Sequence, residues 1–190
     1  TWYVNYLASG ANNGKSWINA YTSLQSAFDA AAAGDSLWFA LGTYDPSKSA
    51  DGVSTHGRDK AFVLKNNVHV FGGFKGTETT FADRKTDSSS LFLYNTTTLD
   101  GNIGNPNDST DNTYHIVIAP ALQDFTLDGF VIKHGRSVGT VSITANGRTI
   151  YRNAAGAIYS DSSKGTYRFL IVEKNLAKSS DASLGGGGAM

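Results

Sequence analysis

The sequence predicts an all-β protein whose backbone winds as a parallel β-helix, with one α-helix covering its N-terminal end. Three observations lead to this fold class. Short runs rich in β-branched and aromatic residues recur between Gly, Asn, Asp, Ser and Pro along most of the chain. Only one segment, 22–33, has a convincing helical pattern, and one apolar run changes parity at Asp128-Gly129.

Composition excludes several classes of partner. Sixteen Lys and Arg residues balance sixteen Asp and Glu residues, so the formal net charge is +0. Nucleic acids and anionic membranes are therefore not expected as partners. The absence of cysteine rules out disulfides and thiolate metal sites, and no apolar run is long enough to span a bilayer. At 190 residues we expect one domain, with a cap region at 1–35 and β-helix coils at 36–190.

The segment 22–33 has the features of a one-sided helix. Thr22 and Gln25 have the spacing of a capping box, and Gly34 supplies a left-handed stop. The apolar face consists of Leu24, Ala27, Phe28 and Ala31. Because only one face is apolar, we expect this helix to cover the open end of the predicted coil.

Strands are expected throughout the remaining chain. The opening residues, TWYVNYLASG, are typical of a strand. Seven further runs have the same composition: 36–41, 61–64, 68–71, 91–94, 115–119, 125–132 and 167–172. A sandwich or an up-and-down barrel would also use such runs, so the strand composition alone does not choose between them.

The change of parity within 125–132 favours the coil. Phe125 and Leu127 alternate inward, whereas Phe130 and Ile132 resume on the opposite parity. A straight strand would expose one of these pairs. A chain that bends at Asp128-Gly129 and continues in a second sheet keeps both pairs inside, and Asp-Gly is common at such turns.

The end of the chain is expected to open a further coil. Gly156-Ala157-Ile158 recurs as Gly188-Ala189-Met190, with a strand and a Glu-Lys-Asn turn at 173–175 between them. Small residues at these positions would let successive coils approach closely. We therefore expect the 190 residues to be a fragment of a longer protein, with LGGGGAM at 184–190 beginning the next repeat.

Several segments resemble secreted bacterial right-handed parallel β-helix proteins, many of them Bacteroidetes surface proteins exported by type IX secretion. The Gly-Ala-Ile and Gly-Ala-Met units with Val172-Glu173-Lys174-Asn175 are similar to repeats of chlamydial polymorphic outer membrane proteins, but Ala155 and Val172 depart from that pattern. The other matching segments are 3–28, 38–44, 68–79 and 127–135. The resemblance implies a right-handed coil, an extracellular or cell-surface location, and bacterial secretion and surface-anchoring machinery as partners.

Three functions are considered on this basis. The preferred interpretation is an adhesin, stalk or interaction scaffold that binds glycans or host or cell-surface proteins and has no catalytic, cofactor or metal residues in this segment. The alternative is the N-terminal part of a β-helix polysaccharide lyase or glycoside hydrolase. A third interpretation, a β-sandwich carbohydrate-binding module, requires antiparallel strands.

The segment DGNIGNPNDSTDN at 100–112 is interpreted as a solvated loop, with calcium binding as the alternative. Its oxygen ligands suit calcium, but their spacing does not match an EF-hand. Asn and Asp are equally common in long turns. The candidate ligands are Asp100, Asn102, Asn105, Asn107, Asp108, Asp111 and Asn112.

The best candidate for an enzymatic site lies around residue 130. Carboxylates and basic groups in β-helix enzymes act as acid, base or nucleophile, and they must stack on one outer sheet to do so. Here Asp128 is better explained by the predicted corner, and the basic residues, which lie beyond the apolar run, are better explained by solvent exposure. The candidate residues are Asp124, Asp128, Lys133, His134 and Arg136.

Other motifs are assigned structural roles. GANNGKSW at 10–17 lacks the spacing of a P-loop and is predicted to be a surface turn. His56, His69, His115 and His134 have no metal-ligand spacing. Trp2 and Trp38 are expected in the cap or core, which leaves three aromatic residues near loops as candidate sugar contacts: Trp17, Tyr21 and Tyr44.

Overall fold

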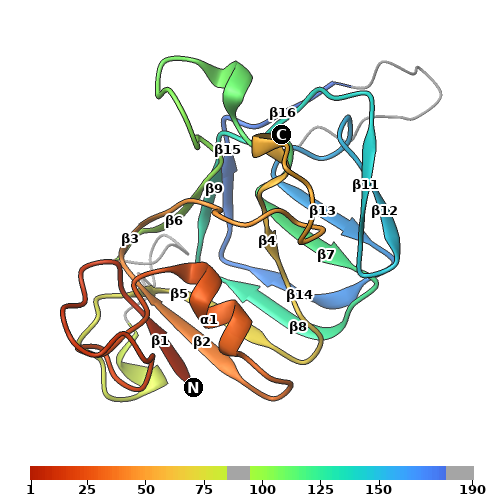
Figure 1. Ribbon diagram of the computed structural model, residues 1–190. Coiled ribbons are helices and arrows are strands. Elements are labelled where there is room, and N and C mark those ends of the chain that lie inside the picture. Colours follow the sequence, from red (N-terminus) through yellow and green to blue (C-terminus); the bar gives the residue numbers. More distant parts are fainter. Residues whose placement is uncertain (85–94, 179–190) are drawn as a thin grey trace.

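The computed structural model describes residues 1–84 and 95–178 (Figure 1). The predicted strand at 91–94 and the glycine-rich segment at 184–190 lie outside these residues. The described chain contains one α-helix, α1 (Leu24–Ala30), and short 3-10 turns at Gly57–Asp59, Phe81–Asp83 and Ser109–Asp111. Its strands are β1 (Trp2–Val4), β2 (Ser36–Ala40), β3 (Gly42–Tyr44), β4 (Phe62–Val63), β5 (His69–Phe74), β6 (Thr97–Asp100), β7 (Val117–Pro120), β8 (Gln123–Asp128), β9 (Val131–Lys133), β10 (Arg136–Ser137), β11 (Ser142–Ala145), β12 (Arg148–Tyr151), β13 (Ile158–Asp161), β14 (Lys164–Arg168), β15 (Ile171–Glu173) and β16 (Leu176–Ala177).

The strands form five separate sheets within the described residues. The largest has the order β1-β2-β5-β8-β14, and the next two have the orders β15-β9-β6-β3 and β13-β7-β4. All neighbouring strands in these three sheets and in the pair β10-β16 run parallel. Strands that follow one another along the chain mostly enter different sheets, so each sheet is built from distant segments (Figure 1).

The prediction of a single right-handed parallel β-helix is wrong. The described strands divide among short separate sheets, and no single solenoid unites them. The strands β11 and β12 form an antiparallel hairpin, which a continuous coil of like-directed strands would not contain. The physical reason is local: most strands are short, and the pairings β2–β5 and β14–β8 each contain a register shift.

The chain changes sheets at residues with left-handed backbone conformation. β8 ends at Asp128, Gly129 has φ +87°, and β9 begins at Val131 in another sheet. The break predicted at Asp128-Gly129 is therefore confirmed. The same conformation recurs at corners on neighbouring strands, at Ala121 and Ser162, at Gly129 and Phe169, and at His134 and Lys174.

Glycine is required where two corners approach each other closely. A Cβ atom on Gly135 would overlap the carbonyl oxygen of Gly156, and one on Gly156 would overlap that of Leu176. The Asn175 side chain also crosses between segments, since its Oδ1 accepts from Gly135 N at 2.8 Å and its Nδ2 donates to Ile132 O at 2.9 Å. The small residue at 156 therefore has the packing role expected from the sequence.

Helix α1 is shorter than the predicted 22–33 segment, and the capping box is absent. Ser23 is the N-cap residue and makes no side-chain cap bond. Gln25 instead donates to Asp29 Oδ1 at 3.0 Å, and the helix stops because Ala31 is extended. The buried residues Leu24, Ala27 and Phe28 pack into the main apolar core, so the predicted apolar face is the one that is used.

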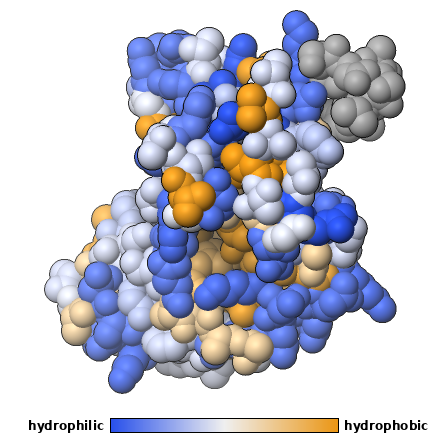
Figure 2. Space-filling view, turned by 45° about the vertical axis from the view of Figure 1, so that its right-hand side comes forward, coloured by the Kyte–Doolittle hydropathy of each residue, from blue (hydrophilic) through white to orange (hydrophobic). Residues whose placement is uncertain are grey.

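The main core consists of inward-facing residues from the three larger sheets. Phe39, Phe125, Leu127, Phe130 and Ile132 are all at most 1% exposed, so both parities of the predicted 125–132 run are buried. Figure 2 shows that hydrophobic residues also reach the surface between hydrophilic ones, including in a hollow near the middle of that face. The polar coverage of the core is therefore incomplete on this side.

Truncation of Phe130 tests the core. Its ring packs edge to face on Phe39 with centroids 5.6 Å apart, and its side chain is buried. We expect Phe130→Ala to lower the free energy of unfolding by about 3–5 kcal/mol, because the change leaves a cavity. Urea denaturation measures this effect. Val53→Ala is the control, since Val53 is 81% exposed and its loss should leave stability nearly unchanged.

Candidate functional site

A row of charged side chains crosses the outer face of the sheet β15-β9-β6-β3. Tyr44 pairs with Leu99, and Leu99 pairs with Ile132. These three side chains are buried, so the residue that follows each of them is directed to the outer side of the sheet. The register also aligns Asp100 with Lys133 and Lys133 with Glu173. We call Asp45, Asp100, Lys133 and Glu173 the charged row.

Asp100 organises the middle of the charged row. His134 Nδ1 lies 2.8 Å from its Oδ1, and Lys133 Nζ lies 3.9 Å from its Oδ2. The main-chain N–H of Asn102 also donates to Oδ1 at 2.9 Å. Because Asp100 is only 9% exposed, these contacts replace most of its hydration. His134 is brought to Asp100 by its left-handed backbone, with φ +70°.

Asp45 has a perturbed acidity. Partial burial raises the pKa of its carboxyl group, and the negative charge of Asp100 raises it further. Its side chain nevertheless reaches solvent at the edge of the sheet. At the other end of the row, Glu173 is exposed and has no side-chain hydrogen bond among residues 1–84 and 95–178. Both ends of the row are thus accessible.

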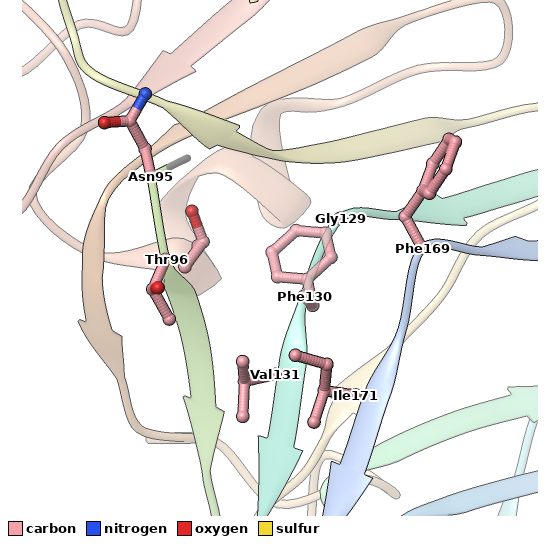
Figure 3. Close-up of a pocket in the computed structure, with 8 residues that line it drawn as sticks. Asn95, Thr96, Gly129, Phe130, Val131, Phe169 and Ile171 are labelled. Carbon is pink, nitrogen blue, oxygen red and sulfur yellow. The ribbon is translucent and has the colours of Figure 1, made fainter. Parts of the chain in front are cut away.

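A small pocket lies on the same sheet at the amino ends of its strands. It has a volume of about 30 Å³. Its lining residues are Asn95, Thr96, Thr97, Gly129, Phe130, Val131, Phe169 and Ile171. Figure 3 shows Asn95 and Phe169 on opposite sides of the pocket, with the Phe130 ring between them in this view. The outer face therefore combines an amide, hydroxyl groups and an exposed aromatic ring with the charged row.

The structure does not bring the predicted enzymatic cluster together as one site. Lys133 and His134 join Asp100, whereas Asp124 lines a separate hollow of about 350 Å³ with Phe125 and Lys164. The Arg136 carbonyl accepts from Arg58 Nη2 at 2.6 Å. Residues adjacent in sequence face in different directions at a corner, and the pairing of distant strands decides which of them meet. The candidate residues are therefore divided between different places in the fold.

Asp128 is a buried structural residue. It is 0% exposed, Arg84 Nη2 donates to its Oδ1 at 2.6 Å, and Arg168 Nε donates to its Oδ2. Arg84 itself lies near the rings of Phe71, Phe74 and Phe81. A buried carboxylate requires such charge-assisted partners, and it cannot at the same time face a substrate. Asp128 therefore links three distant segments.

The 100–112 segment is mainly a loop with internal hydrogen bonds. Asp111 Oδ2 accepts from Asn105 N at 2.7 Å, and Asp108 Oδ1 accepts from Thr110 N at 2.8 Å. Among the described residues, no group of three or more His, Cys, Asp or Glu side chains is placed to hold a metal ion. The Oδ1 atoms of Asn102, Asp111 and Asn112 are buried and have no hydrogen-bond partner among residues 1–84 and 95–178. Calcium binding by this loop stays a prediction.

Two of the three candidate sugar-contact aromatics serve in packing. Trp17 packs on Tyr3 at 4.7 Å, and its Nε1 donates to Glu78 O at 2.8 Å. Tyr44 is 4% exposed, donates to Ala40 O at 3.0 Å and has its pKa raised by burial. Tyr21 is half-buried beside Trp2, with ring centroids 5.9 Å apart.

The turn predicted at 10–17 is confirmed. Gly10 N donates to Ile18 O at 2.9 Å, and Gly14 N donates to Asn19 O at 2.8 Å. Lys15 N donates to Asn13 Oδ1 at 3.1 Å. Backbone groups that would face a phosphate in a P-loop are therefore used within the turn itself.

Sequence reasoning missed Asp45, Glu173 and Phe169. Nothing local in the sequence indicates that Asp45 lies beside Asp100. Glu173 belongs to the turn predicted at 173–175. Phe169 falls within the strand predicted at 167–172, although it stands at a corner with φ +51°. The alternation around Phe130 and Ile132 predicts that Lys133 faces outward, and it is the one signal in the sequence that points to this face of the sheet.

Comparisons with known proteins add no relative. No family model matches the chain, and searches of curated proteins and of solved structures found no match either. In the part of the chain that the structure describes, no helix has the length and apolar character needed to cross a bilayer.

The buried His115 generates a prediction about pH. Burial lowers its pKa to about 4, although its Nδ1–H bond to Ala155 O and the charge of Asp59 act in the opposite direction. In the unfolded chain it titrates near 6.5. The unfolded state thus binds the extra proton between these values, and stability is lost as the pH falls through this window. Between pH 7.5 and 5 the loss is roughly 2 kcal/mol.

Urea denaturation of the wild type and of His115→Gln at both pH values measures this contribution. The substitution should remove most of the pH dependence between pH 7.5 and 5, because glutamine cannot take up the proton that the unfolded histidine binds in this range. An equal pH dependence in both proteins would show that His115 is accessible to protons in the fold.

Proposed function

We propose that this protein is an exported cell-surface adhesin, stalk or interaction scaffold, and that the outer face of the sheet β15-β9-β6-β3 is its contact surface. Bacterial secretion and surface-anchoring machinery and an extracellular location belong to the same proposal. The ligands are glycans or proteins of a host or neighbouring cell. The proposal requires no catalytic residue in this segment.

The observation that carries the proposal is the arrangement of the charged row. Asp100 fixes Lys133 and His134 in place, whereas Asp45 and Glu173 at the ends are exposed. The row stands on a sheet whose inward residues Leu99 and Ile132 are at most 2% exposed. Because Lys133 and His134 are already held by Asp100 on a rigid sheet, they lose little side-chain freedom on binding, which favours a recognition role.

The row contains three acidic residues and one lysine, with His134 beside Asp100, so both signs of charge are present but the acidic groups predominate. Asp59 and Asp128 illustrate the contrasting use of charge, since each is at most 4% exposed and is bound by arginine within the fold. Such buried pairs hold segments together. The charged row differs because its end residues Asp45 and Glu173 are exposed to solvent, where electrostatic complementarity gives specificity.

Binding to coated surfaces tests this function. Purified protein is passed over sensors coated with polygalacturonate, cellulose, mucin or collagen at low and high salt. We expect retention on at least one coating, weaker at high salt because the exposed charges are screened. Lys133→Gln/Glu173→Gln should reduce retention at least fivefold while leaving the net charge unchanged.

The matched control is Asp29→Asn/Lys48→Gln. It removes an exposed ion pair of 3.3 Å between Lys48 and Asp29 of α1, which are not part of the charged row. Retention of this control should equal that of the wild type. The proposal is contradicted if the wild type binds none of the coatings, or if both double variants reduce retention equally.

A polysaccharide hydrolase or lyase is the second candidate, and the neighbouring Asp45 and Asp100 favour it. Stacked carboxylates on adjacent strands are the arrangement that such an enzyme requires. The raised pKa of Asp45 suits a general acid that donates a proton to the leaving glycosidic oxygen. Asp100 with His134 would accept the proton of the attacking water.

The enzymatic candidate is tested by incubating the protein with polygalacturonate and xylan from pH 4 to 8. Release of reducing ends would indicate a hydrolase, and formation of unsaturated uronate would indicate a lyase. Asp45→Asn should reduce any such activity about 10²–10⁴-fold, because the general acid is removed. Asp29→Asn should leave it unchanged. Activity that persists in Asp45→Asn, or no product from the wild type, would rule out this role for the row.

A further inference from the structure

Phe169 occupies a corner where a bulky side chain is disfavoured. Its φ is +51°, in the left-handed region. The paired strands β8 and β14 align Asp128 with Arg168. The residue next to Phe169 at the neighbouring corner is therefore Gly129, with φ +87°. Gly129 N donates to Arg168 O at 3.1 Å, which fixes the two corners together. A glycine would meet the backbone requirement at 169 without strain.

The ring of Phe169 gains little packing in return. It is 40% exposed, and no aromatic ring packs against it within residues 1–84 and 95–178. The Arg168 guanidinium lies 5.5 Å from the centroid of the Phe169 ring. The neighbouring Tyr167 differs, because it packs on Phe125 at 5.3 Å and donates to Ser160 Oγ at 3.1 Å. Structural packing therefore explains Tyr167 but leaves Phe169 unexplained.

Polar groups stand across the pocket from this ring (Figure 3). Asn95 Nδ2 donates to Gly73 O at 3.3 Å, and its Oδ1 has no bond among the described residues. Thr96 adds a hydroxyl group beside it. The pocket thus offers an aromatic surface on one side, with a hydrogen-bond acceptor and a hydroxyl on the other.

We infer that Phe169 with Asn95 and Thr96 forms a carbohydrate subsite in which the apolar C–H face of one sugar ring stacks on Phe169. The sugar hydroxyls would hydrogen-bond to the amide and the threonine hydroxyl. This inference rests on the proposed contact surface and specifies its ligand class. A volume of about 30 Å³ admits one substituent of a sugar, such as a hydroxymethyl group, while the ring stays on the surface.

The subsite and the charged row lie within reach of one ligand. They stand at opposite ends of the same strands, and the three residues from Thr97 to Asp100 span about 10 Å. The side chains of Val131 and Ile171 lie between them on the outer face. An oligosaccharide of several units can therefore contact the ring at one end and the charged row at the other.

Calorimetry with cellohexaose and with hexagalacturonate tests the subsite. We expect the wild type to bind at least one of these probes and Phe169→Ala to weaken that binding at least tenfold. Phe169→Tyr keeps the ring and should bind within threefold of the wild type. Tyr151→Ala is the control, since Tyr151 is 48% exposed on the hairpin β11-β12 and should not affect binding.

Phe169→Gly separates a binding role from a packing role. Glycine relieves the left-handed strain, so this variant should melt at the wild-type temperature or above while losing at least tenfold in affinity. A lower melting temperature with unchanged saccharide binding would overturn the inference. It would also be overturned if the wild type bound neither hexasaccharide yet was still retained on protein-coated sensors, and that result would leave the proposed contact surface standing.

Discussion

The left-handed residue at each corner is the constraint on which the remaining structure depends. A strand of two-residue period can bury its apolar side chains on one face only. When the chain bends at a left-handed residue and enters another sheet, the inward parity is reset, so Leu127 and Phe130 are both buried. Equivalent corners lie side by side at the ends of neighbouring strands. The same change in the parity of inward-facing residues therefore occurs in each of these segments.

Charge is used inside the fold to secure these corners. Asp128 immediately precedes Gly129 and is held by Arg84 from one segment and Arg168 from another. The pair Asp59 and Arg152 joins the 3-10 turn at Gly57–Asp59 to the end of the hairpin β11-β12. Both aspartates are buried, so removal of an arginine would leave an uncompensated charge. These pairs specify which distant segments meet.

Along each strand, alternate side chains point into the core, and the side chains between them point outward. In the sheet β15-β9-β6-β3, the aligned residues Tyr44, Leu99, Ile132 and Val172 are each followed by a charged residue on the outer side, which produces the charged row without any local sequence motif. Phe169 adds an exposed ring at the corner of the same sheet. A binding role for this face is consistent with both features, because neither improves packing of the interior.

Local sequence patterns determined the mostly β character of the chain, the apolar face of α1, the turn at 10–17 and the break at Asp128-Gly129. These features depend on residues close together in the sequence. Tertiary structure decided the rest: separate short sheets in place of one solenoid, the antiparallel hairpin β11-β12, and the meeting of Asp45 with Asp100. Pairing register between distant strands is set by packing of the whole core, and a single sequence does not reveal which distant residues will face each other.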